Sequence, residues 1–167
     1  MVLLQRQLPE RHGYCSAVVT YAKTGKKKTL ARMKHNLLTT AGKNWVHAQL
    51  YTNTAAGTRG AGWVASTEST ITPAIGDTTL TGEIATNGLT RADAGTGTGV
   101  LTHTGGSNSS TVEYTFTATG SFTSVLASAL FTASSSGTMP HIANFATGSG
   151  TLATNDTLKI TWTLNAS

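Results

Sequence analysis

The chain has 167 residues, of which 38% are hydrophobic and only 11% are charged, and its formal net charge is +5. Its length suits a single domain, and the alternating β-branched and aromatic residues of its later part argue against disorder. No hydrophobic run is long enough to span a membrane, and the short run at the start is too brief for a signal peptide. We therefore expect a globular protein made in the cytoplasm, with no membrane contact.

The charge is divided unevenly along the chain. Residues 1–43 contain nine lysines or arginines and one acid, whereas residues 44–167 contain three bases and six acids. The first part therefore carries a net charge of +8 and the second a net charge of −3. This asymmetry favours an acidic partner for the first part, either nucleic acid or the acidic face of another protein.

The first elements in chain order are an irregular arm and a hairpin. Residues 1–16 show no regular pattern, and residues 17–22 are typical of a strand. A turn opens at Thr24 and Gly25, and we expect Lys26, Lys27 and Lys28 to lie at its tip. Residues 30–38 alternate imperfectly, so that they fit either a second strand or a linker.

One short helix is predicted at residues 41–51. Ala41, Trp45 and Ala48 recur at helical spacing there, and Thr39 or Thr40 is suited to cap the first turn. We divide the chain before this helix, into a basic N-terminal arm or hairpin over residues 1–35 and a β domain over residues 36–167.

Beyond the helix, turn residues separate short strand patterns. The clearest strands are residues 111–118 and 158–164, where apolar side chains alternate with polar ones. Further strands are expected at residues 61–66, 89–94, 100–104, 122–132 and 139–145. Asp77 is expected to cap a helical turn over residues 80–84. The pattern predicts a mainly β fold: a single antiparallel β-sandwich or jelly-roll-like domain with one short helix and a basic N-terminal arm.

Four segments resemble motifs of small virion proteins from tailed bacteriophages. Residues 36–44 (NLLTTAGKN) resemble the motif N-x-(V/I)-T-x-x-G-(R/K)-N, and residues 71–83 (ITPAIGDTTLTGE) resemble a segment that precedes a strand with an arginine, here Arg91. Residues 129–139 (ALFTASSSGTM) resemble G-L-F-x-A-x-x-G-x-M, with alanine where the first glycine is usual. Residues 156–164 (DTLKITWTL) resemble the closing motif D-x-L-x-(V/I)-T-W-T-(L/I).

The resemblance covers about residues 36–164, which is most of the chain, and implies a structural virion protein without catalytic residues. It implies a capsid decoration (cement) protein that stabilises the shell by bridging capsid subunits, or else a tail, neck or fibre-base protein. The expected partners are the major capsid protein or another virion protein, together with further copies of the chain in a homo-oligomer. Nucleic acid bound by the basic N-terminal segment is the third alternative.

Patterns for catalysis, metals or cofactors are weak. The five histidines lack metal-ligand spacing, and Cys15 is the only cysteine, which we interpret as a passive thiol. The glycines at 95–99 lack the lysine and helix of a phosphate loop. Glu83 is interpreted as the partner of Arg91 in a structural ion pair rather than as an acid or base. We predict no enzyme and no catalytic, metal-binding or cofactor-binding residue.

The basic segment is the strongest functional signal in the sequence. A clamp on an acidic capsid surface is the favoured interpretation, while nonspecific phosphate binding and a merely solvated hairpin stay open. Apolar anchors and cations of this segment are the expected partner-binding residues: Leu3, Leu4, Arg6, Leu8, Arg11, Lys26, Lys27, Lys28 and Arg32.

Overall fold

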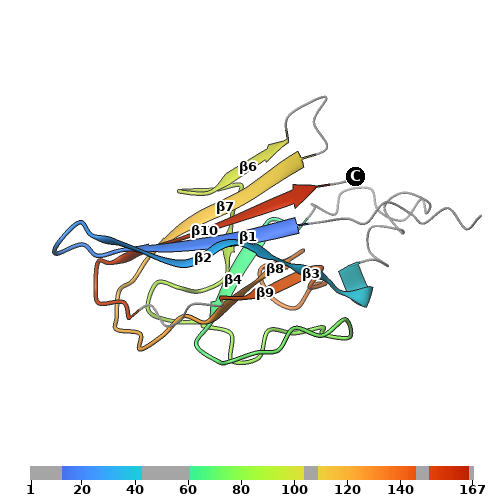
Figure 1. The fold of residues 1–167 in the computed structure, drawn as a ribbon, viewed down its shortest axis with the longest axis horizontal. Coiled ribbons are helices and arrows are strands. Elements are labelled where there is room, and N and C mark those ends of the chain that lie inside the picture. The colour runs from blue at the N-terminus through green and yellow to red at the C-terminus, as the bar shows by residue number, and fades with distance from the viewer. Residues whose placement is uncertain (1–12, 43–60, 104–108, 146–150, 166–167) are drawn as a thin grey trace, which may run out of the picture.

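Two five-stranded antiparallel sheets pack face to face in the computed structural model, which describes residues 13–42, 61–103, 109–145 and 151–165 (Figure 1). This arrangement confirms the predicted mainly β, antiparallel sandwich. One sheet has the order β2-β1-β10-β7-β6 and the other the order β3-β9-β8-β4-β5. The strands are β1 (Gly13–Thr20), β2 (Lys27–His35), β3 (Leu37–Leu38), β4 (Trp63–Thr67), β5 (Ala92–Asp93), β6 (Val100–His103), β7 (Ser109–Thr117), β8 (Ala127–Phe131), β9 (His141–Asn144) and β10 (Thr157–Asn165).

The core between the sheets follows from the alternation seen in the sequence. Leu158, Ile160 and Trp162 of β10 are fully buried, whereas Lys159 between them is exposed. Trp162 lies opposite Cys15 of β1 and Val112 of β7, so that three neighbouring strands contribute to one buried row. A period of two residues thus places one face of each strand in the core, as expected for a sandwich.

A second, smaller core explains why all five residues of β8 are buried. The segment after β4, residues 68–84 (the covering segment), runs back across the outer face of its own sheet, and Leu80 packs there against Ala129, Phe131 and Ile142. The Thr67 hydroxyl fixes this segment, because it lies within hydrogen-bonding distance of the carbonyl oxygens of Thr81 and Gly82 (2.7 and 2.8 Å). One face of β8 therefore contacts the main core and the other contacts this covering segment.

Residues 13–35 form two strands of the sandwich, which corrects the expected division of the chain at residue 35. β1 pairs with β10 along its whole length, and its residues Cys15, Ala17 and Val19 are buried in the core. Leu30 of β2 is buried as well. The charges of this segment predict an arm, but its buried apolar residues make it part of the sandwich. Residues 1–12, the rest of the expected arm, lie outside the described residues.

The predicted helix begins at Thr40, directly after the buried Thr39. The Thr39 hydroxyl accepts a hydrogen bond from the Gly42 N–H (3.0 Å) and donates one to the Met139 carbonyl oxygen (2.6 Å). Thr39 is therefore the N-cap, and it also ties the helix start to the segment before β9. Residues 43–51 of the expected helix lie outside the described residues. Within the described ranges, no helix has the length and apolar character that crossing a bilayer requires.

The predicted cap at Asp77 is wrong. Residues 80–84 form turns and a single bridge rather than a helical turn, and the Asp77 carboxylate accepts a hydrogen bond from the Ala74 N–H behind it (2.8 Å). An aspartate can close a turn in this way because its short side chain reaches the nearby backbone. The local pattern did not distinguish this turn from a helix start.

Cys15 is expected to be unreactive in the folded protein. Its side chain is fully buried, and burial raises the pKa of the thiol because the thiolate would be poorly solvated there. Since the thiolate is the nucleophile, a thiol reagent should label Cys15 only as fast as the protein opens. The measurement is the labelling rate at neutral pH with and without denaturant, and equal rates in both conditions would contradict this prediction.

Candidate partner-binding surface at the β1–β2 hairpin

The hairpin between β1 and β2 extends past the neighbouring loops at one end of the sandwich (Figure 1). The turn is formed by residues 22–25, and Gly25 occupies the left-handed region with φ of 66°. The Tyr21 carbonyl oxygen accepts a hydrogen bond from the Gly25 N–H (2.8 Å), and the Tyr21 N–H donates to the Lys26 carbonyl oxygen (2.9 Å). Lys27 and Lys28 therefore begin β2, which corrects their expected place at the tip of the turn.

A buried carboxylate braces the base of this hairpin. Asp156 is only 5% exposed, and its two oxygens accept hydrogen bonds from the backbone N–H groups of Ala22 (2.7 Å) and Ala153 (2.8 Å). The Asp156 carbonyl oxygen also accepts a hydrogen bond from the Ala118 N–H, at the end of β7 (2.8 Å). One residue thus connects the hairpin, the turn before β10 and the end of β7, which holds the base of the hairpin in place.

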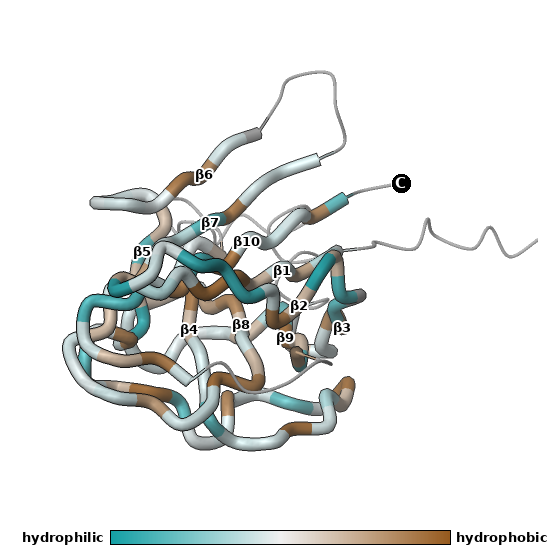
Figure 2. The backbone as a smooth tube through the Cα atoms, turned by 60° about the vertical axis from the view of Figure 1, so that its left-hand side comes forward, coloured by the Kyte–Doolittle hydropathy of each residue, from teal (hydrophilic) through white to brown (hydrophobic). Residues whose placement is uncertain are grey.

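The hairpin and β2 collect most of the positive charge of the described residues. Six cations lie within twelve residues, and the tube coloured by hydropathy shows this part of the chain as hydrophilic (Figure 2). No acid occurs among the described residues from Gly13 to Thr67. The six cations are Lys23, Lys26, Lys27, Lys28, Arg32 and Lys34.

The carboxylates of the described residues are engaged elsewhere. Glu68 accepts hydrogen bonds from the N–H groups of Thr123 and Ser124, Asp93 accepts one from the Gly95 N–H, and Glu113 pairs with Lys159. Glu83 pairs with Arg91, while Asp77 and Asp156 accept hydrogen bonds from the backbone N–H groups of Ala74 and Ala22. Lys23, Lys26, Lys27, Arg32 and Lys34 form no ion pair with a described carboxylate. The hairpin therefore presents a concentrated positive charge that favours an anionic partner.

The expected partner-binding residues fall into two groups. The structure brings Lys26, Lys27, Lys28 and Arg32 together on the hairpin and β2. Leu3, Leu4, Arg6, Leu8 and Arg11 lie outside the described residues. Sequence reasoning missed Asp156 as the brace of the hairpin, because it lies 134 residues from Ala22 and no local pattern connects the two.

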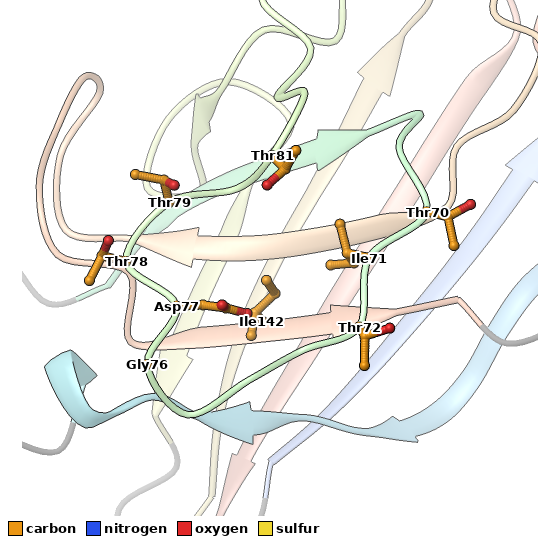
Figure 3. A pocket seen from close by; sticks show the side chains of 9 residues that line it. All are labelled: Thr70, Ile71, Thr72, Gly76, Asp77, Thr78, Thr79, Thr81 and Ile142. Atoms are coloured by element: carbon orange, nitrogen blue, oxygen red, sulfur yellow. The ribbon is translucent and has the colours of Figure 1, made fainter.

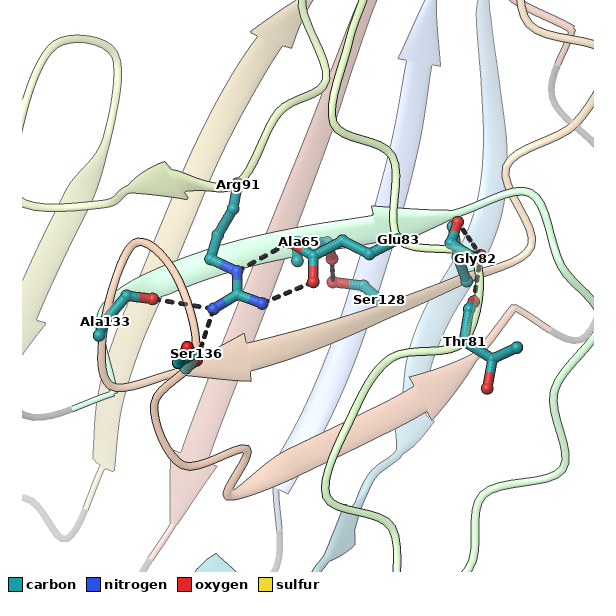
Figure 4. Close-up of polar contacts among 9 residues, drawn as sticks. Ala65, Thr81, Gly82, Glu83, Arg91, Ser128, Ala133 and Ser136 are labelled. Carbon is teal, nitrogen blue, oxygen red and sulfur yellow. Dashed lines mark hydrogen bonds and ion pairs between the residues drawn. The ribbon is translucent and has the colours of Figure 1, made fainter.

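The Arg91–Glu83 pair has a structural geometry (Figure 4). Nε and Nη2 of Arg91 bond the two carboxylate oxygens of Glu83 (2.8 and 2.5 Å), and Nη1 donates to the carbonyl oxygens of Ala133 and Ser136 (3.0 and 2.9 Å). The guanidinium also lies over the Phe131 ring, 3.5 Å from its centroid. Because these contacts use most of its donors, Arg91 fixes the turn after β8 rather than offering a binding site.

A hollow of about 380 Å³ lies between the covering segment and β9 (Figure 3). Threonine side chains and Ile142 surround it, and Asp77 is the only acid among its lining residues. That carboxylate is already bonded to the Ala74 N–H, and Glu83 does not line the hollow. The hollow therefore lacks the pair of carboxylates that acid–base chemistry on a sugar would need. Among the described residues, no group of three histidine, cysteine or acidic side chains could hold a metal ion.

Comparisons with protein-family models, with curated proteins and with solved structures found no match to this chain.

Proposed function

We propose that this chain is a non-enzymatic structural protein of a larger assembly, specifically a decoration protein that stabilises a tailed-phage capsid by bridging its subunits. The observation that carries the proposal is the braced basic hairpin on a rigid sandwich. A fixed, positively charged projection suits repeated contact with an acidic protein surface, because little conformational freedom is lost when it binds.

The mechanism is additive. The hairpin contacts an acidic patch on one shell subunit, and other surfaces of the same molecule, including the anchors expected among residues 1–12, contact its neighbours. Each bridging contact adds to the free energy needed to separate subunits. Because the chain binds the assembled shell and not its separate subunits, its binding stabilises the assembled shell by mass action. Contacts between copies of the chain would raise the effective concentration of each hairpin at the shell.

Two alternatives make different predictions. A tail, neck or fibre-base protein would use the same surface for a partner that is present in few copies. A nucleic-acid-binding module is favoured by one observation, the concentration of six cations within twelve residues of the chain. Phosphate binding would show a steep loss of affinity with rising salt, because each neutralised phosphate releases counterions.

The proposal is tested by the abundance of the chain in purified particles. We expect quantitative mass spectrometry to find about one copy per shell subunit, or a simple fraction of that number. A handful of copies per particle would move the protein to the tail or fibre. Absence from particles would overturn the virion proposal and favour the nucleic-acid alternative.

The hairpin contact is tested separately with a charge-removing variant, Lys26→Ser combined with Lys27→Ser. We expect the variant to fold normally, since both side chains are exposed, and to bind shells that lack the chain roughly ten-fold more weakly. The matched control is Lys159→Ser, which removes an exposed cation of β10 on the same sheet. Equal loss of binding in both variants would show that the hairpin has no particular role.

A further inference from the structure

The edge strand β2 contains an irregularity that presents one apolar side chain among cations. In the pairing of β1 with β2, Cys15 lies opposite Lys34 and Ala17 opposite Ala31, so that Arg32 and Met33 together face Ser16. Two residues opposite one define a β-bulge. The Met33 N–H donates to the Ser16 hydroxyl oxygen (2.9 Å), which holds the bulge in place.

Met33 has a backbone conformation that glycine would adopt more easily. Its φ is 44°, in the left-handed region that side chains with a β-carbon rarely occupy. Its side chain is nevertheless 62% exposed, the largest exposed fraction among the large hydrophobic residues of the described ranges. The fold therefore holds a methionine at an unfavourable position without burying it, which indicates that folding alone does not explain this side chain.

The surroundings of Met33 identify the chemistry of a partner. Arg32 and Lys34 flank it in sequence, and the hairpin lysines precede it on the same edge strand. No acid lies among the described residues from Gly13 to Thr67, so the excess positive charge of this edge favours a partner that carries negative charge. Bulges and lysines discourage an edge from pairing with a further strand, and contact through side chains is the mode that remains.

The apolar side chain distinguishes a protein partner from nucleic acid. Phosphate oxygens are bound by cations and hydrogen-bond donors and give an exposed methionine no apolar contact. Methionine and arginine are enriched in protein interfaces, and the flexible thioether adapts to varied apolar surfaces. Charge and apolar contact together favour an acidic protein segment that also carries an apolar residue.

We propose that the bulged edge of β2, defined by Arg32, Met33 and Lys34, docks an acidic segment of a partner protein, with Met33 contacting an apolar residue between the carboxylates. This inference rests on the proposed function only in taking the partner to be a protein. The expected partner segment is both acidic and apolar, and Met33 gives the surface its selectivity for such a segment over polyanions that lack apolar groups.

The test uses the full-length purified chain and three probes. The first probe is a short synthetic peptide that contains glutamate and leucine, the second replaces each leucine with serine at the same charge, and the third is a short DNA duplex. Fluorescence anisotropy at low salt measures the affinity for each. We expect the glutamate–leucine peptide to bind roughly ten-fold more tightly than the glutamate–serine peptide, because only the former buries Met33.

Variants at position 33 separate binding from folding. Met33→Gly suits the left-handed backbone, so we expect an unchanged or raised melting temperature together with loss of the preference for the leucine peptide. Met33→Asn also tolerates this conformation, and we expect it to lose the preference for the leucine peptide as well. This second variant tests the inference even if glycine loosens the strand. The control is Ile75→Ser, which removes another exposed hydrophobic residue far from β2 in the sequence and should leave the preference intact.

Three results would overturn the inference. They are equal affinity for the two peptides, no peptide binding at low salt, and tighter DNA binding that Met33→Gly leaves unchanged. The last result would assign the edge to nucleic acid. Because these measurements need no virus particle, their failure is distinguishable from failure of the abundance test, which concerns where the chain is assembled.

Discussion

Replacing Arg91 with alanine is expected to lower the free energy of unfolding by about 3–5 kcal/mol. The substitution leaves the carboxylate of Glu83, whose side chain is 24% exposed, without its bidentate partner. It also removes the donors to the Ala133 and Ser136 carbonyl oxygens and the contact with the Phe131 ring. The turn between β8 and β9 should lose its attachment to the covering segment.

Chemical denaturation of the wild type and the variant measures this effect. Arg91→Lys should recover only part of the loss, because an ammonium group cannot form the forked contact with Glu83 and also reach both carbonyl oxygens. Lys159→Ala is the matched control: it breaks the ion pair with Glu113, but the Lys159 side chain is 51% exposed, and the expected loss is within about 1 kcal/mol. Similar losses for Arg91→Ala and Lys159→Ala would refute a structural role for the Arg91–Glu83 pair.

Replacing Asp156 with alanine is expected to cost about 3 kcal/mol, because two backbone N–H groups lose their acceptor at a largely buried position. The structure should loosen most at Ala22, where the turn of the hairpin begins. Asp156→Asn keeps one acceptor oxygen but turns an N–H toward one of the donors, so an intermediate loss is expected.

Thermal unfolding gives the loss of stability, and hydrogen exchange at the Ala22 amide shows whether the hairpin itself loosens. Asp77→Ala is a useful control, since Asp77 also accepts a backbone hydrogen bond but does so within an exposed turn. We expect Asp77→Ala to cost less than Asp156→Ala and to leave exchange at Ala22 unchanged. An unaltered exchange rate in Asp156→Ala would mean that the carboxylate does not brace the hairpin.

Much of the sandwich could be predicted because alternation is a local property of the sequence. In β10 the buried Leu158, Ile160 and Trp162 are separated by polar residues, and this period fixes both the strand and its inward face. The strand before it in the sheet, β1, was expected to start at residue 17 rather than at Gly13. Its first residues Gly13 and Cys15 are small, and their burial depends on the neighbouring β10 rather than on a strong local pattern.

Features that depend on distant residues could not be predicted in the same way. A second register shift in β2, between the pairs Ala17–Ala31 and Val18–Thr29, accompanies the burial of both Leu30 and Ala31, and these consecutive buried residues disrupt the local alternation. The role of Asp156 depends on Ala22, from the opposite end of the chain. The sequence predicts the pairing of Arg91 with Glu83 because both lie within a short segment, but the two carbonyl contacts from the turn after β8 have no sequence signal.

The register of β1 against β10 has a practical consequence for engineering. Gly13 lies opposite Leu164, so the chain enters the first strand and leaves the last one side by side, at the end of the sandwich away from the hairpin (Figure 1). A cargo domain fused after Asn165 would start at the end of the sandwich opposite the hairpin turn and would not compete with a partner bound at that turn. The same proximity suits a circular permutant, in which a short linker joins residues 13 and 165 and new ends open in an exposed loop. The fold can thus serve as a display scaffold whose attachment and presentation sides are separated by the length of its strands.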